Sequence, residues 1–322
     1  MSDLDCVMTD IRCTDCVDLL KMQADNSVQL VVTSPPYEDA RTYGELGFGL
    51  RGQEWVDWFA PIVREMVRVC DGLVAIVVEG KTRQFQWSAT PALLMADLHR
   101  SGVCLRKPPI FHRVGVPGSG GKDWLRNDYE FIVCCTKGGK LPWSDNTACG
   151  KECKWPVGGR MSNRNRDGVR KNSRHRSENP DYTPEPKVEK FLSGDMPPGS
   201  KLHTKNNGSR MRVQCYTPPA KANPGNVIKC NVGGGRMGSS LAHENEAPFP
   251  ESLVEFFVKS FCPPGGTVLD PFCGSGTTAA ACIKNGRHFI GCDIRESQED
   301  LTRRRIAEVF GGGEACVAGE RN

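Results

Sequence analysis

Short apolar runs alternate along the chain with segments whose apolar residues recur at helical spacing. The run Val28 to Val32 is apolar at four of its five positions and contains three valines, which predicts a buried strand of a parallel sheet. Leu73 to Val78 and Glu130 to Cys135 predict further strands, and Asp71-Gly72 predicts a turn. An amphipathic helix is predicted by the helical spacing of Trp55, Trp58, Phe59, Ile62, Met66 and Val67.

The same alternation continues towards the C-terminus. Strands are predicted at 267–269 and 289–293, and helices at 91–100, 252–261, 277–284 and 301–309. Strands that alternate with helices indicate an α/β fold, a mostly parallel sheet with helices on both faces.

The pattern stops between residues 141 and 225, where Pro, Gly, Asn, Ser, Lys and Arg dominate. So long an irregular stretch within a compact domain is typical of a functional insertion or of disorder. We therefore expect two halves of one domain at 1–140 and 226–310, an insert at 141–225 and a flexible tail at 311–322. Residues 38–52 hold four glycines and predict a mobile loop.

Charge is unevenly distributed along the 322 residues. The net charge is +4, but residues 151–212 alone hold 15 Lys and Arg against 7 Asp and Glu. A basic region of this kind favours a polyanionic partner, although a solvated basic loop would give the same pattern.

Composition narrows the cellular setting. No stretch approaches the roughly 20 apolar residues of a membrane span, and the acidic N-terminus lacks a signal peptide, so we expect a cytosolic protein with reduced thiols. Four of the 16 cysteines could together hold a structural zinc ion. Their spacing matches no zinc finger closely, so we expect no metal; they are Cys149, Cys153, Cys215 and Cys230.

Residues 267–293 have the order of a nucleotide-binding half-sheet: strand, glycine-rich turn, helix and a strand that ends in an acid. Gly274 and Gly276 permit a tight turn and a close backbone approach to a ligand. Asp293 follows about 20 residues later, where a carboxylate can accept hydrogen bonds from ribose hydroxyls. The turn lacks the three-glycine phosphate fingerprint, which favours a cofactor without phosphate.

Two segments resemble motifs of the amino-DNA methyltransferases, which use S-adenosylmethionine to methylate an exocyclic amine of a DNA base. They are Thr33-Ser34-Pro35-Pro36-Tyr37 and the segment from Val268 to Thr278. The resemblance implies a Rossmann-like fold. It also implies that the methionine moiety of the cofactor is held by Asp270, Pro271, Phe272, Gly274, Gly276 and Thr277. Segments 247–253 and 15–20 are similar to family segments beside the cofactor, which adds Phe249 and, near the adenine, Asp15.

The resemblance also assigns roles to the first motif. The exocyclic amine of cytosine is a poor nucleophile, because its lone pair is delocalised into the ring. Acceptors aimed at the amino protons draw electron density towards nitrogen, and Ser34 and the Pro35 carbonyl can supply them, on a backbone stiffened by Pro36. Tyr37 offers a flat face on which an extruded base can stack.

The first position of this motif favours a particular base. Family members with Ser there mostly methylate cytosine at N4, whereas Asp or Asn mostly accompanies adenine N6. Ser34 therefore favours cytosine, Arg41 and Tyr43 resemble the cytosine-N4 members, and adenine N6 is the alternative. Cytosine-C5 methylation needs a thiolate, usually in a Pro-Cys pair, which does not occur in this chain.

Motif order resembles that of the circularly permuted β group, in which a target-recognition region lies between the catalytic and cofactor segments. The resemblance implies double-stranded DNA as substrate. It is compatible with a homodimer, and it leaves open whether a cognate restriction endonuclease accompanies the protein. Asn127 to Ile132 resembles the stretch that borders the base pocket. Phosphate contacts are expected from Arg164, Arg166, Arg170, Lys171, Arg174 and Arg176, unless they belong to a disordered basic insert.

Two other functions fit parts of the pattern. A non-catalytic DNA-binding protein could retain the fold, but decay normally removes one of the two motifs and both are intact. A methyltransferase acting on RNA or protein amines could share the Pro-Pro-aromatic motif, but the permuted order and the basic insert favour DNA.

Overall fold

The computed structural model describes residues 7–38, 49–115, 123–152, 201–204, 210–213, 221–232, 237–245 and 248–311. The chain divides into two compact units, the first formed by residues 1–149 and 224–322 and the second by residues 150–223. Within the second unit, β9 (Lys151–Glu152) pairs with β12 (Lys221–Ala222), and β10 (Lys201–Thr204) pairs with β11 (Arg210–Val213), both antiparallel.

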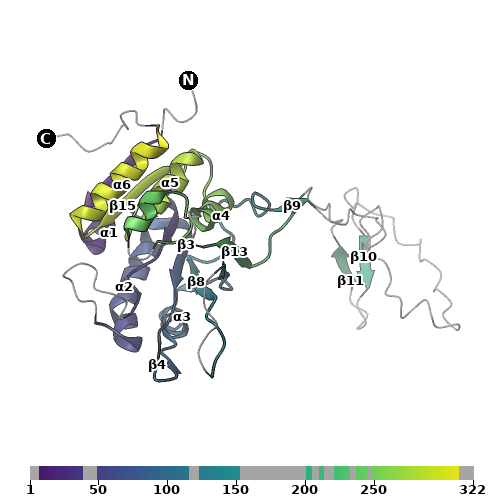
Figure 1. The fold of residues 1–322 in the computed structure, drawn as a ribbon. Coiled ribbons are helices and arrows are strands. Elements are labelled where there is room, and N and C mark those ends of the chain that lie inside the picture. Colours follow the sequence, from purple (N-terminus) through teal and green to yellow (C-terminus); the bar gives the residue numbers. More distant parts are fainter. Residues whose placement is uncertain are drawn as a thin grey trace. The chain divides into compact units, whose positions relative to one another are not determined.

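A single large sheet forms the centre of the first unit (Figure 1). Its strands follow the order β1-β15-β14-β2-β3-β8-β7-β13. They are β1 (Thr9–Cys13), β15 (His288–Asp293), β14 (Thr267–Asp270), β2 (Val28–Thr33), β3 (Cys70–Val78), β8 (Tyr129–Thr136), β7 (Ile110–Val114) and β13 (Val227–Asn231). The five strands from β1 to β3 are parallel, and β8 is antiparallel to both of its neighbours. The short β6 (Cys104–Leu105) also pairs with β8.

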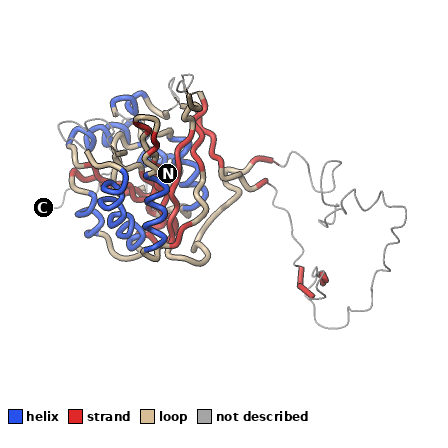
Figure 2. The backbone as a smooth tube through the Cα atoms, turned by 90° about the horizontal axis from the view of Figure 1, so that it is seen from below, coloured by secondary structure: helices blue, strands red, loops and turns tan. Residues whose placement is uncertain are grey.

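Helices cover both faces of this sheet (Figures 1 and 2). One apolar cluster contains residues of α1 (Cys16–Met22), α2 (Gly52–Val69) and α3 (Thr90–Arg100). The other contains residues of α4 (Glu251–Phe261), α5 (Thr277–Lys284) and α6 (Glu296–Val309). Leu30 and Val32 belong to the second cluster and Val31 to the first, so side chains of the central β2 alternate between two buried faces. The expected α/β architecture is confirmed.

The expected turn at Asp71-Gly72 is wrong. β3 begins at Cys70, directly after α2, and both residues lie within the strand. The pairing of β2 with β3 shifts register, since Val28 pairs with Cys70 whereas Leu30 pairs with Leu73. The bulge takes up an extra residue, and a Cβ on Gly72 would lie 2.1 Å from the Gln29 carbonyl oxygen. This glycine therefore serves close backbone approach and not chain reversal.

The other expected elements are present with small changes in bounds. The last helix, α6, begins five residues earlier than expected, at Glu296. Residues 141–149 belong to the first unit and not to the second: Leu141 packs on the core, and the Asp145 amide donates to the Ser260 carbonyl at 2.9 Å. Among the described residues, no helix is long and apolar enough to cross a membrane.

Candidate active site

The two sequence motifs meet at one edge of the sheet. β14 pairs with β2 through Val268–Leu30 and Leu269–Val31, so the two strands end side by side. Ser34 follows the end of β2, and Pro271 follows the end of β14. The carboxyl ends of parallel strands are where open α/β sheets bind ligands.

A buried hydrogen bond joins these two strand ends. The Thr33 hydroxyl donates to Asp270 Oδ1 at 2.6 Å, between residues 237 positions apart in the chain. Asp270 also accepts from the Thr278 hydroxyl at 2.5 Å and from the Phe272 amide at 3.1 Å. Burial raises the pKa of Asp270 to about 6, because its hydrogen bonds only partly compensate for lost water. Asp270 therefore holds the two motifs together.

The turn after β14 depends on its glycines. Gly274 and Gly276 have φ of 49° and 72°, the left-handed region that favours glycine. A Cβ on Gly276 would lie 2.9 Å from Thr302 Cγ2, and one on Gly274 would lie 2.8 Å from Asn245 Nδ2. The Thr302 hydroxyl donates to the Gly274 carbonyl at 2.9 Å, which fixes the turn against α6.

Two further acids lie beside this turn. Asp293 ends β15, and its carboxylate accepts from the amides of Gly274 at 3.2 Å and Arg295 at 3.0 Å. Asp15 follows the neighbouring β1, whose Cys13 pairs with Asp293. One Asp15 oxygen caps α1 by accepting from the Val17 amide at 2.7 Å. Asp15, Asp270 and Asp293 thus all lie at this edge.

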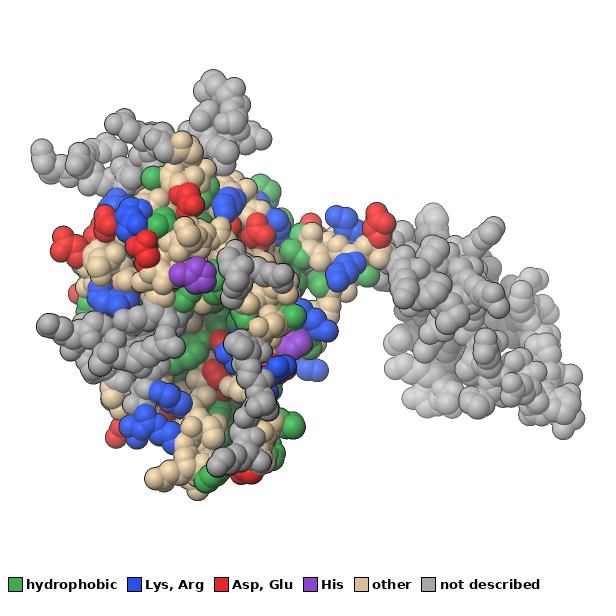
Figure 3. All heavy atoms as spheres, viewed as in Figure 1, with side chains coloured by type: hydrophobic (Ala, Val, Ile, Leu, Met, Phe, Trp, Pro, Cys, Tyr) green, Lys and Arg blue, Asp and Glu red, His purple; other side chains and the backbone are tan. Residues whose placement is uncertain are grey.

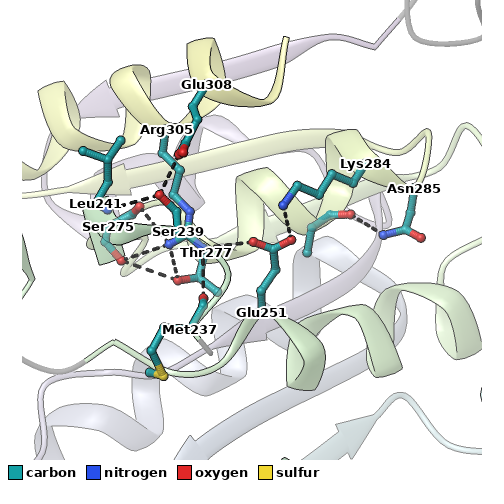
Figure 4. A network of polar contacts seen from close by, with 11 residues as sticks. Met237, Ser239, Leu241, Glu251, Ser275, Thr277, Lys284, Asn285, Arg305 and Glu308 are labelled. Carbon is teal, nitrogen blue, oxygen red and sulfur yellow. Dashed lines mark hydrogen bonds and ion pairs between the residues drawn. The ribbon is translucent and has the colours of Figure 1, made fainter. Parts of the chain in front are cut away.

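A buried arginine is hydrogen-bonded to the residue that follows the glycine turn (Figure 4). Arg305 of α6 is fully buried and donates to Thr277 Oγ1 at 2.9 Å and to Glu251 Oε2 at 3.1 Å. Burial lowers the pKa of Arg305, and its ion pair with Glu251 opposes that shift. Lys284 pairs with the other Glu251 oxygen. No sequence pattern indicates this network, because Arg305 is one of three consecutive arginines in a helix rich in polar residues.

Aromatic rings border the turn on the opposite face of the sheet. Phe272 packs 6.1 Å from Phe59 and 6.3 Å from Trp58, between ring centroids. From the same helix, Trp55 Nε1 donates to the Pro36 carbonyl at 2.9 Å. α2 thereby contacts both motifs. Phe249 is partly buried and packs on the core cluster of the other face.

The catalytic motif leads into a chain of polar contacts. The Ser34 hydroxyl donates to Tyr37 Oη at 3.5 Å, and Tyr37 Oη donates to Glu130 Oε2 at 2.6 Å. Arg113 pairs with the other Glu130 oxygen at 3.3 Å. Burial and the negative charge of Glu130 raise the pKa of Tyr37 well above its ordinary value, so its phenol stays neutral. Glu130 lies in the stretch expected to border the base pocket.

Glu79 is a second carboxyl group at this place, and the sequence analysis missed it. It follows β3, opposite Glu130, because Val78 pairs with Phe131 across β3 and β8. Its Oε1 accepts from the Gly80 amide at 2.8 Å and from Trp87 Nε1 at 3.0 Å. Its Oε2 is buried, and no donor among the described residues reaches it.

The surroundings of Glu79 favour its neutral form. Burial raises the pKa of Glu79 to about 7, and Glu130 adds to this rise, while the hydrogen bonds from Gly80 and Trp87 and the charge of Arg113 oppose it. Carboxyl groups poised near neutral pH cluster at functional sites. The sequence did contain a signal for Glu79, an acid at the carboxyl end of a buried strand. Asp293 stands at the corresponding end of β15.

Glu38, the residue after Tyr37, is a third carboxyl group with several hydrogen bonds. It is buried and accepts from the amides of Gly52 at 2.8 Å and Lys81 at 2.6 Å, and from the hydroxyls of Thr90 at 2.7 Å and Ser88. Burial opposes its ionisation, but these hydrogen bonds outweigh that effect and lower the pKa of Glu38. One carboxylate thus joins the catalytic motif to the starts of α2 and α3.

Several expected site residues lie outside the described residues. They are Arg41, Tyr43, Arg164, Arg166, Arg170, Lys171, Arg174 and Arg176, and the cysteines Cys153 and Cys215. Cys230 is buried in β13, and Cys149 Sγ contacts the Phe256 carbonyl at 3.9 Å. In the ranges that the structure describes, no cluster of His, Cys, Asp and Glu could hold a metal ion.

The surface of the first unit is hollowed (Figure 3). The hollow has hydrophobic side chains on its floor and acidic side chains beside them, in the region where Figure 1 labels α2 and β8. A concave apolar surface with a few convergent polar groups is the usual form of a ligand site. The arrangement can therefore take a flat, partly apolar substrate that carries hydrogen-bond donors.

Comparison with known proteins gives consistent results. A family model described as DNA methylase, of the N6 and N4 type, matches residues 28–304. The orphan methyltransferase M.BamHII of Bacillus amyloliquefaciens is 25% identical over 290 residues, which cover 88% of this chain and 89% of the relative.

Two solved structures share the fold. The PvuII DNA methyltransferase (cytosine-N4-specific) aligns with a TM-score of 0.60 at 16% identity, over 94% of this chain and 92% of its own. A putative DNA modification methylase from Thermus thermophilus, complexed with S-adenosyl-L-methionine, aligns with a TM-score of 0.53 at 21% identity, over 98% of this chain and all of its own.

Proposed function

Because the chain belongs to the DNA methylase family of N6 and N4 methyltransferases, we propose that it transfers a methyl group from S-adenosylmethionine to N4 of a cytosine extruded from double-stranded DNA. The observation that carries this proposal is the Thr33–Asp270 hydrogen bond of 2.6 Å. It joins the start of the catalytic motif to the start of the cofactor motif at one edge of the sheet. A methyl donor held at one strand end therefore lies beside a base held at the next.

The residues around the glycine turn suit this cofactor. Asp15, Asp270 and Asp293 would repel the phosphates of a dinucleotide. They suit a ligand with a cationic sulfonium, an ammonium group and ribose hydroxyls. Asp293 ends β15, where it can accept from ribose hydroxyls, and Gly274 and Gly276 leave room for close approach. When bound, the cofactor supplies an electrophilic methyl group.

Ser34 is proposed to accept a hydrogen bond from the amino group of the base. Its own proton points to Tyr37 Oη, so its lone pairs are available to an amino hydrogen. Tyr37 in turn donates to the charged Glu130, and such a chain polarises each hydroxyl in the direction that strengthens Ser34 as an acceptor. Glu130 and Arg113 act here as positioning residues.

Glu79 is proposed to take the proton that the reaction releases. When bound, the cofactor would supply its methyl group to the amino nitrogen and would leave with the electron pair of the carbon–sulfur bond on sulfur. The methylated nitrogen then carries one proton too many. A carboxylate whose pKa lies near 7 accepts that proton and later returns it to water. The buried Oε2, which has no donor among the described residues, is the atom assigned to this step.

The assignment of cytosine rests on Ser34. Cytosine and adenine present the same donor and acceptor pair to the site, an amino group beside a ring nitrogen. The first motif position is the feature of this chain that favours N4 of cytosine over N6 of adenine.

The test is mass spectrometry of nucleosides from DNA incubated with the protein and isotopically labelled S-adenosylmethionine. Labelled N4-methylcytosine is expected. Labelled N6-methyladenine would retain the reaction and overturn the base assignment, and absence of label from every DNA tested would overturn the reaction.

A matched pair of variants tests the role of Ser34. Ser34→Ala removes the acceptor and should lower turnover by about 10²-fold or more, the usual effect of losing one preorganised hydrogen bond. Cofactor affinity, measured by calorimetry, should stay nearly unchanged. Ser34→Thr keeps the hydroxyl and should retain more activity than Ser34→Ala. An equal loss of turnover and cofactor affinity would contradict the assigned role.

A further inference from the structure

A short hairpin stands at the same edge of the sheet as the catalytic motif. β4 (Thr82–Arg83) pairs with β5 (Gln86–Trp87) between the end of β3 and the start of α3. All six residues from 82 to 87 are exposed, and β4 lies beyond α3 at the end of the first unit in Figure 1. The hairpin therefore reaches outward from the rim of the site.

The turn of this hairpin carries two strained residues. Gln84 and Phe85 have φ of 47° and 66°, and two-residue turns of this kind ordinarily use Asn or Gly. Phe85 is 85% exposed, so the unfavourable backbone presents a large aromatic ring to solvent. Strain and exposed apolar surface are both costs that a fold without a partner would avoid.

Exposed aromatic residues gather around this hairpin. Among the described residues, four aromatic side chains are exposed, and they belong to the hairpin, to β8 or to the chain just before β8: Phe85, Trp87, Trp124 and Tyr129. Trp87 stacks on Phe131 with ring centroids 6.1 Å apart, and Tyr129 packs on the same ring at 5.6 Å. Trp87, Phe131 and Tyr129 therefore form one group of rings on either side of Glu130 in β8.

The base of the hairpin is bound to the catalytic motif. Trp87 donates to Glu79 at 3.0 Å, and Ser88 and the Lys81 amide both donate to Glu38, the residue after Tyr37. Phe85 is two residues from Trp87, so its Cα lies within about 8 Å of the rim of the site. A ring at the tip would meet the duplex close to the extruded base.

The charge of the hairpin matches a polyanion. Residues 81–89 contain Lys81 and Arg83 and no acid. Cations beside an exposed aromatic ring are typical of elements that follow a phosphate backbone while the ring stacks on bases. A protein surface would not require this charge.

We propose that the β4–β5 hairpin inserts Phe85 into the DNA stack, in the space that the extruded base leaves. The proposal rests on the proposed function and adds the element that holds the duplex open. Apolar side chains that enter base steps stabilise distorted DNA in this way. Trp87 couples the insertion to the pocket through Glu79.

The test compares methylation of two DNA substrates by Phe85→Ala. The methylated site is first mapped by sequencing DNA treated with the wild-type protein. One duplex then carries the paired target base, and the other carries the target opposite an abasic position, where extrusion costs less. On the paired duplex, Phe85→Ala should lower kcat/KM by roughly 5- to 150-fold, the worth of one base stack. On the abasic duplex, its rate should recover to within about threefold of the wild-type rate.

Two controls accompany this variant. Phe85→Trp keeps an aromatic ring and should retain most activity on both duplexes. Met22→Ala changes another exposed apolar residue, 57% exposed at the end of α1, and should behave as wild type on both.

The outcomes separate the two proposals. An active wild type with equal losses for Phe85→Ala on both duplexes, or with no loss on either, would overturn the insertion and leave the methyltransferase intact. A changed oligomeric state in light scattering, without a substrate-dependent loss, would assign Phe85 to a protein contact and also overturn it. A wild type that methylates no DNA would overturn the proposed function itself.

Discussion

The ionisation of Glu79 predicts a distinctive pH dependence of methyl transfer. If its carboxylate takes the released proton, activity requires the charged form. With a pKa of about 7, roughly one tenth of the protein carries that form at pH 6 and one hundredth at pH 5. We therefore expect kcat/KM to fall about tenfold per pH unit below pH 7. A glutamate with its ordinary pKa near 4.3 would cause no fall until about pH 5.

Replacement of the carboxyl group should abolish this dependence. Glu79→Gln keeps the side-chain size and an acceptor for Trp87 but cannot titrate. Its rate should be lower at pH 8 by about 10²- to 10⁴-fold, the usual contribution of a positioned base, and flat from pH 5.5 to 8.5. The assay is transfer of a radiolabelled methyl group to DNA at subsaturating DNA, with circular dichroism to check folding at each pH.

The charges of Glu130 and Arg113 predict the direction in which the inflection of the rate profile should move. Glu130 raises the pKa of Glu79 and Arg113 lowers it. Glu130→Gln should therefore move the inflection of the rate profile to lower pH, and Arg113→Met should move it to higher pH. An inflection near pH 7 that persists in Glu79→Gln, or two neighbour variants that shift it in the same direction, would refute the reasoning.

Three further changes test the cofactor side of the site. Arg305→Met should lower the free energy of unfolding in urea by about 3–5 kcal/mol, because it leaves the buried Glu251 with Lys284 as its remaining ion-pair partner. The control Arg304→Met removes an exposed pair with Glu244 and should cause no measurable change. Equal effects of the two variants would contradict the role assigned to the buried pair. Burial raises the pKa of Asp270 from 3.8 to about 6, so the folded state binds a proton more tightly than the unfolded chain does. Wild-type stability should therefore fall by about 2 kcal/mol as pH rises from 4 to 6. Asp270→Asn cannot titrate, so urea titrations at pH 4 and pH 6 should show no such loss for this variant. If the stability of both proteins falls equally with pH, Asp270 is not the group responsible. Gly276→Ala places a side chain at φ of 72°, with its Cβ 2.9 Å from Thr302 Cγ2, so the turn would be strained. Calorimetry should show cofactor affinity reduced by at least tenfold. Unchanged affinity would show that the turn adapts to the added methyl group.

Much of the fold followed from local pattern. Strands such as Val28 to Val32 are buried on both faces and apolar at all but one position, and helices such as α2 keep one apolar stripe, so both could be predicted without tertiary information. Asp71-Gly72 misled because a glycine that admits a neighbouring carbonyl looks the same in sequence as one that reverses the chain. Strand direction could not be predicted from local pattern either. β8 runs antiparallel to β3, yet both strands are rich in apolar residues.

The site divides in the same way. Ser34, Tyr37, Asp270 and Asp293 stand in recognisable motifs, and β2, β14 and β15 place them at one edge. Glu79 and Arg305 belong to no recognisable motif, because their roles depend on the residues that surround them in the folded protein. One is a carboxyl group with an unmatched oxygen, and the other is a guanidinium enclosed by neighbouring elements. Burial of a charged side chain is set by the assembled fold and leaves no periodic trace in the sequence.

The adjacency of β2 and β14 has a consequence for the order in which the molecule can be made. During synthesis, residues 28–33 emerge long before residues 267–270, so β2 waits with one edge unpaired while most of the chain is translated. A parallel pairing across so long a separation is a late event in folding. An incomplete chain therefore has no partner for Thr33 and no turn beside Ser34. Methylation activity should therefore be absent from any chain that stops before residue 267, although its catalytic motif has already been made.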